Sequence, residues 1–106
     1  MYDEQNLTYY SKNKKIELTI LEHKAFMILL KNKNQITTYK QLCQELYETE
    51  LDTFIKGSIS IVIHRLRIKF KNEFKIRMRR KLGYVIDWEV KNEYGKRKMA
   101  FKIYMR

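Results

Sequence analysis

Proline is absent from this sequence of 106 residues, cysteine occurs once and glycine three times. The single cysteine, Cys43, cannot form an internal disulfide, which suits a reducing compartment such as the cytoplasm. No run of about 18 apolar residues occurs, so no membrane-spanning helix is predicted. The first ten residues, MYDEQNLTYY, are acidic and lack the apolar segment of a signal peptide. We therefore expect a cytoplasmic protein.

The residues that catalysis requires are also scarce. The sequence has two histidines, one cysteine and no cluster of carboxylates, so no acid–base pair, metal-ligand set or phosphate-binding loop can be recognised. We expect no enzyme, and hence no catalytic residues, no metal and no cofactor. The apolar content of 44%, with 13% aromatic residues, is that of a folded protein, and 1–106 is predicted to be a single domain.

Acidic residues are scarce in only one half of the chain. Residues 1–53 hold seven Lys or Arg against eight Asp or Glu, a net charge of −1, whereas residues 54–106 hold sixteen against four, a net charge of +12. The total of +11 is therefore concentrated in the second half. Positive charge of this density favours a polyanionic partner, either nucleic acid or an anionic membrane surface.

Periodicity and capping patterns outline the start of the fold. Residues 7–18 place apolar residues on both sides of the polar turn SKNKK, which predicts a short β-hairpin. Thr19 and Glu22 form a capping-box pattern at the start of a helix over about 20–31. Its apolar face contains Leu21, Ala25, Ile28 and Leu29.

A second capping box, Thr38 with Gln41, opens another predicted helix. The inward residues of this helix are Tyr39, Leu42, Cys43 and Leu46. On that face Cys43 is expected to be a packed core thiol rather than a nucleophile. The helix is followed by an acidic loop, YETELDTF, over residues 47–54.

The segment IVIHRLRIKF belongs to a third predicted helix over about 56–71. At about 100° per residue its core face contains Ile59, Val62, Ile63, Leu66 and Phe70. The opposite face has no acidic residue and contains Gly57, Ile61, His64, Arg65 and Ile68. Arg65 beside Ile61 suits a DNA major groove, where guanine accepts from a guanidinium and a thymine methyl contacts an aliphatic side chain. Exposure of the two isoleucines is also compatible with a protein partner or with no contact.

After residue 72 the apolar period changes to two, which predicts a β-hairpin with a basic tip. One face of its first strand contains Phe74, Ile76 and Met78, and the other Lys75, Arg77 and Arg79. The turn is Arg80, Lys81, Leu82 and Gly83, after which Tyr84, Ile86 and Trp88 continue. The expected fold class is α+β, a winged helix-turn-helix. It has a short N-terminal hairpin, a core of three helices with the third as recognition helix, and a C-terminal hairpin wing.

These motifs together resemble the OmpR/PhoB-type effector domain of bacterial two-component response regulators. The first helix opens with the family's hydrophobic-Leu-Thr-x-x-Glu pattern, here Leu18, Thr19 and Glu22. The Ile-x-Arg-Leu-Arg-x-Lys run of the recognition helix is matched by Ile63, Arg65, Leu66, Arg67 and Lys69, and the closing Gly-Tyr of the wing by Gly83 and Tyr84. The resemblance covers about residues 7–87 and implies sequence-specific binding of double-stranded DNA by a transcriptional regulator.

The resemblance and the charge pattern imply roles for individual residues. Base contacts are assigned to Ile61 and Arg65, and phosphate contacts to Lys56, Ser60, His64, Arg67 and Lys71. The wing contributes Arg77, Arg79, Arg80 and Lys81, with Arg80 at the minor groove. In the family the loop between the second and third helices contacts RNA polymerase, and in this chain that loop carries Glu48, Glu50 and Asp52. Gly57, Met78 and Lys81 depart from the usual family residues, which affects the expected target sequence rather than the DNA-binding role.

The two ends of the chain depart from the family pattern. Family members carry a receiver domain and a four-stranded N-terminal sheet, whereas this chain has no receiver and room for about two of those strands. It is expected to be an excised effector domain or a free-standing regulator. Residues 88–106 alternate in polarity beyond the wing, which predicts an extra strand that pairs with 84–90 or offers a dimer edge; a basic tail is the alternative. A homodimer on DNA half-sites is among the expected assemblies.

Two other kinds of partner were weighed against duplex DNA. RNA readers usually present stacking aromatic residues on a sheet, whereas this chain presents a basic helix. A basic amphipathic helix can bind an anionic membrane surface, but its apolar face here is assigned to the core. Duplex DNA is therefore the leading prediction, and an RNA-binding or membrane-surface module is the alternative.

Overall fold

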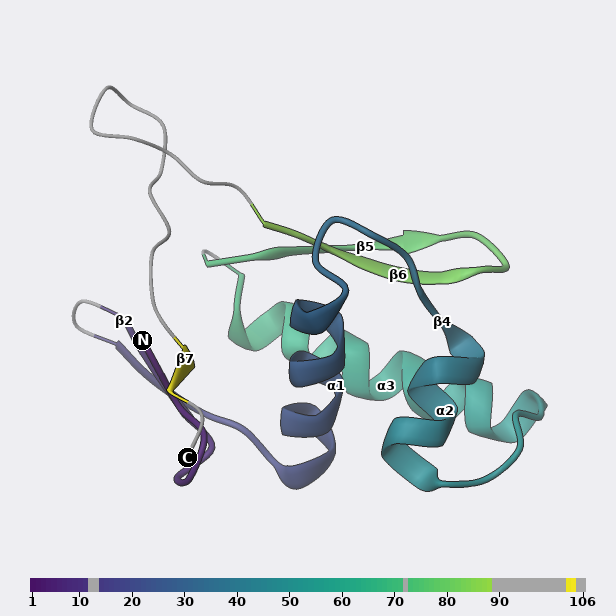
Figure 1. Cartoon of the computed structure of the whole chain (residues 1–106), viewed down its shortest axis with the longest axis horizontal. Coiled ribbons are helices and arrows are strands. Elements are labelled where there is room, and N and C mark those ends of the chain that lie inside the picture. Colours follow the sequence, from purple (N-terminus) through teal and green to yellow (C-terminus); the bar gives the residue numbers. More distant parts are fainter. Residues whose placement is uncertain (12–13, 72, 89–102, 105–106) are drawn as a thin grey trace. The chain divides into compact units, whose positions relative to one another are not determined.

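Three helices and two separate β-sheets make up the computed structural model, which describes residues 1–11, 14–71, 73–88 and 103–104 (Figure 1). Contacts divide the chain into two units, Met1–Ile20 with Glu89–Arg106 and Leu21–Trp88. The first unit contains one of the sheets. The second unit contains the helices and the other sheet.

The sheet of the first unit has four strands in the order β3-β2-β1-β7. Their bounds are β1 Tyr2–Asp3, β2 Thr8–Ser11, β3 Lys14–Glu17 and β7 Ile103–Tyr104. β2 and β3 confirm the hairpin predicted over 7–18, since they are antiparallel with Tyr9 opposite Ile16. Both of these side chains are buried.

The sequence analysis missed β1. Asp3 Oδ1 accepts hydrogen bonds from the backbone N–H groups of Gln5 at 3.1 Å and Asn6 at 3.3 Å, and this turn sends the chain back into β2. The first twenty residues therefore supply three strands of the sheet rather than the two that were expected.

The fourth strand, β7, corrects the predicted partner of the C-terminal segment. The sequence predicts an extra strand beside 84–90, but β7 pairs in parallel with β1, with Tyr2 opposite Ile103. The remainder of the segment 89–106 lies outside the described residues. A C-terminal strand therefore completes the N-terminal sheet.

The helices are α1 (Ile20–Lys31), α2 (Tyr39–Tyr47) and α3 (Thr53–Lys69). α1 has the bounds that the sequence predicts. α2 opens with the predicted capping box: the Gln41 N–H donates to Thr38 Oγ1 at 3.1 Å, and the Thr38 N–H donates to Gln41 Oε1 at 2.8 Å. No helix in the described part of the chain is long and apolar enough to cross a lipid bilayer.

α3 begins at Thr53 rather than at 56 and ends at Lys69 rather than at 71. Its N-cap is Asp52, whose Oδ1 accepts the Ile55 N–H at 2.8 Å. The sequence interpretation assigned Asp52 to an acidic loop over 47–54, because an acidic run does not reveal which carboxylate caps the next helix. The connection between α2 and α3 is therefore shorter than predicted.

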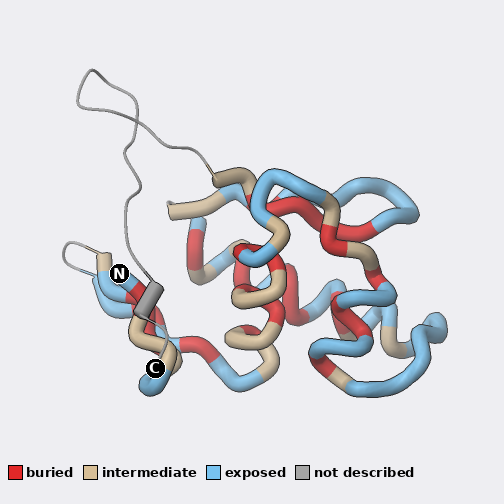
Figure 2. The backbone as a smooth tube through the Cα atoms, viewed as in Figure 1, coloured by how far each residue is buried: buried red, intermediate tan, exposed pale blue. Residues whose placement is uncertain are grey.

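Buried residues of the second unit come from all three helices and from the sheet (Figure 2). α3 buries the predicted arc of Ile59, Val62, Ile63, Leu66 and, just past its end, Phe70. α1 buries Glu22, Ala25, Phe26, Leu29 and Leu30, whereas the predicted core residues Leu21 and Ile28 are only partly covered. The buried face of α1 includes Phe26 because its ring stacks on Phe70, with 4.7 Å between the centroids.

The sheet of the second unit is the predicted wing with one strand added. β5 (Lys75–Arg79) and β6 (Gly83–Asp87) are antiparallel, and β4 (Thr37–Thr38), which the sequence does not predict, pairs with the other edge of β6. Ile76 is buried as expected, but Met78 is exposed rather than inward. Met78 is on β5, the edge strand of the order β4-β6-β5, whereas Tyr84 opposite it on the central strand β6 is buried.

Gly83 belongs to the strand pairing rather than to the turn. A Cβ on this residue would lie 2.0 Å from Thr37 O and 2.8 Å from Thr38 Cα. Only glycine therefore lets β4 approach β6 this closely. The turn itself is Arg80–Leu82, in which Lys81 adopts a φ of 64°, and the Leu82 N–H donates to Arg79 O at 2.9 Å.

Candidate nucleic-acid interface

The solvent-exposed face of α3 is apolar and basic, and α3 contains no acidic residue. Ile61, Ile68, His64 and Arg65 are exposed on it, as predicted. Gly57 leaves this face open, since no atom outside the adjacent backbone of the helix lies within 4 Å of the position that a Cβ would take. The structure adds Phe54, which the sequence analysis placed in the loop although it precedes Ile61 by two turns.

Three residues that were predicted to contact phosphates fasten one flank of α3, Lys56 to α2 and Ser60 and Arg67 to the sheet. Lys56 Nζ lies 4.5 Å from the centroid of the Tyr39 ring. Ser60 Oγ lies 3.2 Å from the Tyr84 hydroxyl, and Arg67 Nε donates to Ile76 O at 2.8 Å. Ser60 and Arg67 thus hold α3 against the hairpin and Lys56 holds it against α2, roles that the sequence does not predict.

Tyr39, one of two tyrosines at this junction, stays protonated at neutral pH. Burial, followed by hydrogen bonding to Tyr84, raises the pKa of Tyr39 to about 12. The rings of Tyr39 and Tyr84 meet edge to face with 5.5 Å between centroids, and the Arg67 guanidinium lies 5.6 Å from the Tyr84 ring. The junction is therefore aromatic and cationic, with α3 held from two strands and from α2.

These contacts also define the direction of α3 relative to the wing. Ser60, in the first half of α3, meets Tyr84 close to the tip, and Arg67, in the second half, meets Ile76 near the base of β5. The start of α3 and the tip of the hairpin therefore lie at the same end of the second unit (Figure 1). The exposed face of α3 and the wing tip can contact one ligand together.

The wing tip carries the exposed cations Arg79, Arg80 and Lys81. Arg77 is held differently, because its Nε and Nη2 donate to the two carboxylate oxygens of Asp87 at 2.8 and 3.0 Å. The hydrogen bond to Asp87 raises the pKa of the exposed Arg77 above its ordinary value. Arg77 thus links β5 to β6 behind the tip.

At the other flank of α3 lies an ion pair that the sequence analysis missed. Lys69 Nζ donates to Glu22 Oε1 at 2.6 Å, and the Glu22 side chain is only 2% exposed. The capping box of Glu22 with Thr19 stays a prediction. The pair ties the end of α3 to the start of α1, so both flanks of the recognition helix are fixed.

The connection between α2 and α3 contains three exposed acidic residues, and two of them cap helices. Glu48 is the C-cap of α2, with φ 51° and its N–H donating to Gln44 O at 3.1 Å, and Asp52 is the N-cap of α3. Cys43 is buried as predicted, and its Sγ donates to Thr49 O at 3.0 Å. Of the three carboxylates in the predicted polymerase-contact set, only that of Asp52 caps a helix, since Glu48 caps α2 with its backbone N–H and Glu50 caps neither helix.

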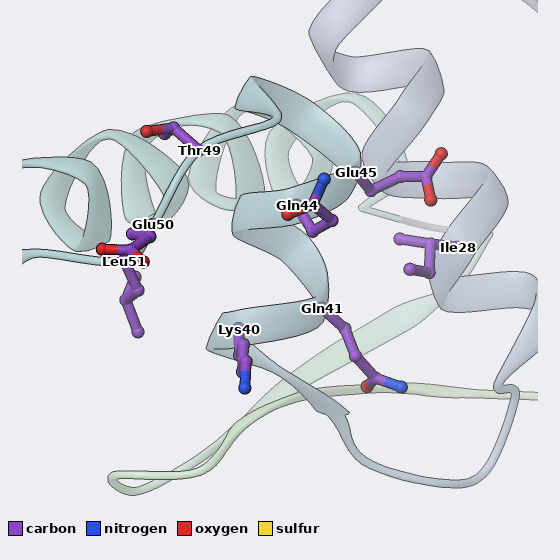
Figure 3. A pocket seen from close by; sticks show the side chains of 8 residues that line it. All are labelled: Ile28, Lys40, Gln41, Gln44, Glu45, Thr49, Glu50 and Leu51. Carbon is purple, nitrogen blue, oxygen red and sulfur yellow. The ribbon is translucent and has the colours of Figure 1, made fainter.

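A surface hollow of about 660 Å³ lies beside this connection (Figure 3). Its walls come from α1, α2 and the loop and are formed by Ile28, Lys40, Gln41, Gln44, Glu45, Thr49, Glu50 and Leu51. In the described part of the chain no group of three His, Cys, Asp or Glu side chains could hold a metal ion.

Comparison with known families identifies the class of protein that this architecture defines. The family described as "Transcriptional regulatory protein, C terminal" matches residues 13–86. The chain belongs to this family, and the resemblance to OmpR/PhoB-type effector domains is confirmed. No curated protein matches the chain in sequence.

Solved structures show the same winged-helix fold. The DNA-binding domain of Bacillus subtilis CssR matches with a TM-score of 0.71 at 19% identity, over 81% of this chain and 97% of that one. The DNA-binding domain of CpxR from E. coli matches with a TM-score of 0.70 at 22% identity, over 81% and 87%. The DNA-binding domain of the response regulator AdeR, in complex with an intercistronic region, matches with a TM-score of 0.67 at 19% identity, over 83% and 93%.

Proposed function

We propose that this domain binds double-stranded DNA sequence-specifically, with α3 in the major groove and the β5–β6 tip at the adjacent minor groove. The observation that carries the proposal is the acid-free exposed face of α3, at the same end of the unit as the cations of the wing tip. Membership in a family of transcriptional regulatory domains supports it, as does the likeness to the AdeR domain in complex with an intercistronic region.

In this proposal Arg65 and Ile61 read base edges. The two residues are one helical turn apart on the exposed face of α3, and a major groove is wide enough to admit that helix. A guanidinium donates two hydrogen bonds to guanine O6 and N7, and an aliphatic side chain contacts a thymine methyl. No contact of Arg65 with an acidic residue is described in residues 1–11, 14–71 and 73–88, so its donors remain available.

Some of the side chains assigned to phosphates are exposed to solvent, and others already bond to the sheet. His64 and Lys71 are exposed and can approach the backbone directly. Lys56 is exposed and keeps donors available above the Tyr39 ring, whereas Ser60 and Arg67 mainly orient α3 through their bonds to the sheet. We therefore retain all five residues at the interface but assign the last two chiefly a positioning role.

At the wing we assign Arg80 to the minor groove, and Arg79 and Lys81 to the flanking phosphates. A narrow A·T-rich minor groove concentrates negative potential and attracts an inserted arginine without base-specific hydrogen bonds. Arg77 contributes positive charge to this region, but its guanidinium is already bonded to Asp87. It therefore stiffens the hairpin that presents the tip.

The structure disfavours the two alternative partners. The aromatic ring that α3 meets on the hairpin, Tyr84, is buried and therefore cannot stack on an RNA base. The apolar arc of α3 from Ile59 to Leu66 is buried in the core and is not free to enter a membrane surface. Neither alternative has a supporting observation within the described residues.

We also propose that the loop carrying Glu48, Glu50 and Asp52 contacts a protein, with RNA polymerase as the candidate from the family resemblance. Carboxylates are repelled by a phosphate backbone, and Glu50 with Leu51 borders the hollow of Figure 3. Binding as a homodimer to two half-sites is the proposed assembly, because one recognition helix reads only a few base pairs. The cytoplasm is the proposed location.

A salt-titrated comparison of duplex DNA, duplex RNA and anionic vesicles tests the proposal. Lys56, Lys71, Arg79 and Lys81 are the expected phosphate cations, and four such contacts give a slope of roughly −3.6 in log K against log[salt] for B-DNA. Duplex DNA should bind most tightly, and a sequence selected from a random pool should bind more tightly than its scrambled control. Equal or tighter binding to RNA or vesicles would contradict the proposal.

A further inference from the structure

Three large apolar side chains line the solvent-exposed face of α3. Phe54, Ile61 and Ile68 are 79%, 54% and 62% exposed, although helices usually place such residues in a core. They are seven residues apart, which at about 100° per residue puts all three on the same side of the helix. An apolar row of this kind needs a partner that removes it from water.

The polar residues of α3 indicate which DNA bases this face can contact. α3 contains no Asn, Gln, Asp or Glu, so it lacks the amides that pair bidentately with adenine N6 and N7 and the carboxylates that accept from cytosine N4. Arg65 can still donate to guanine. The apolar row can contact the thymine methyl, which is the apolar group on the base edges of the major groove.

We infer that the DNA sequence read by α3 is rich in thymine, and that Phe54 and Ile61 recognise thymine 5-methyl groups in the major groove. This inference rests on the proposed function and specifies its substrate class. Phe54 lies in the first turn of α3, and the N-terminal residues of a recognition helix are those that reach base edges. Ile68 lies near the other end of the helix and contributes less.

The spacing of the two readers predicts a spacing in the operator. Seven residues of α-helix span about 10.5 Å. This distance corresponds to about three base steps of 3.4 Å each. Arg65 lies one turn beyond Ile61, so a guanine is expected close to the second thymine.

Charge favours DNA over a second copy of the chain as the occupant of this face. His64, Arg65 and Lys71 lie on or beside the apolar row, and α3 carries no acidic residue to pair with them. Two copies packed through this face would bring like charges together, which opposes association. A polyanion bearing methyl groups satisfies both the basic and the apolar residues.

Replacing thymine by deoxyuracil removes only the 5-methyl group and leaves the minor groove and the base pairing unchanged. The full chain is first used to select tight binders from a random duplex pool, and the selected duplex is then remade with deoxyuracil at one thymine at a time. At each contacted thymine the affinity should fall roughly fourfold, which corresponds to about 0.8 kcal/mol for burial of one CH2-sized group. Removing both contacted methyls should lower the affinity roughly fifteenfold if the effects add.

Alanine variants then show which side chain contacts each thymine methyl. Ile61→Ala should weaken binding to the thymine duplex and abolish the effect of deoxyuracil at one position, and Phe54→Ala should do so at another. Both side chains are exposed, so alanine leaves no cavity and the variants should unfold at the wild-type temperature. Ile20→Ala is the matched control, because Ile20 is 65% exposed but lies outside α3 and should leave every affinity unchanged.

The outcomes separate this inference from the proposed function. Specific DNA binding with equal affinity for the thymine and deoxyuracil duplexes overturns the thymine-methyl inference alone. Absence of any preference for duplex DNA over duplex RNA overturns the proposed function itself. If Phe54→Ala and Ile61→Ala keep the full deoxyuracil effect, these residues do not read the methyls and the inference is wrong.

Discussion

Substituting alanine for Gly83 tests how the wing is joined to the helices. The added Cβ would lie 2.0 Å from Thr37 O and 2.9 Å from Thr37 C, so β4 and β6 cannot both keep their positions. The obstacle is backbone, which cannot move aside as a flexible side chain can. Gly83 also has a φ of +156°, a conformation that strains an L-residue. Overpacking and backbone strain each cost about 1–3 kcal/mol, so Gly83→Ala should lower the free energy of unfolding by about 2–6 kcal/mol.

Gly57 provides a matched control within the same unit. It lies inside α3, and apart from adjacent helix backbone no atom lies within 4 Å of the position of an added Cβ. Gly57→Ala should therefore raise the free energy of unfolding by about 0.5–1 kcal/mol, because alanine loses less conformational freedom in a helix. Urea denaturation followed by circular dichroism measures both variants. A Gly83→Ala protein with the wild-type midpoint would refute the close approach of β4 to β6.

Further variants test the proposed contacts. Arg65→Ala should reduce discrimination against the wrong base by about 1–3 kcal/mol in competition titrations, and equal losses on selected and random duplexes would make Arg65 a phosphate contact. Arg80→Ala should weaken binding more to A·T-flanked than to G·C-flanked operators, and unchanged flank preference would exclude its insertion in the minor groove. Lys81→Ala should reduce the magnitude of the salt slope by about 1 unit, whereas an unchanged slope argues against a phosphate contact. Replacing Glu48 and Glu50 by Gln together should change transcription in a reconstituted assay but hardly change operator affinity, and a large affinity loss would contradict the placement of this loop.

Features that depend on neighbouring residues could be predicted from the sequence. The buried arc of α3 follows from the spacing of Ile59, Ile63 and Leu66, and the capping box of α2 follows from Thr38 and Gln41. Both involve residues within one or two turns of each other, so periodicity and short motifs contain the necessary information. The order of these elements then indicated the winged-helix fold.

Features that depend on distant partners could not be predicted. Ser60 meets Tyr84 across 24 positions, and Lys69 meets Glu22 across 47 positions. In the sequence Ser60, Lys69 and Glu22 are simply polar residues of helices, and nothing local distinguishes a side chain that faces solvent from one that contacts a distant element. The same reason explains why β4 was missed, since a strand of two residues has no detectable period.

Phe54 was missed although a signal was present. Its spacing of seven from Ile61 would have placed it on the exposed face of α3 if the helix had been started at Asp52. Asp52 could not be identified as the N-cap of α3, because it lies in the same acidic segment as Glu48 and Glu50. The error in one helix boundary therefore removed one residue from the candidate interface.

Methylation interference at guanine N7 tests most directly whether α3 reads the major groove, because N7 lies in that groove and minor-groove contacts do not involve it. On a selected duplex, methylation of one guanine should block the wild-type protein, and the same methylation should have little effect on Arg65→Ala. If no guanine N7 interferes and only adenine N3 in the minor groove does, α3 does not bind as proposed.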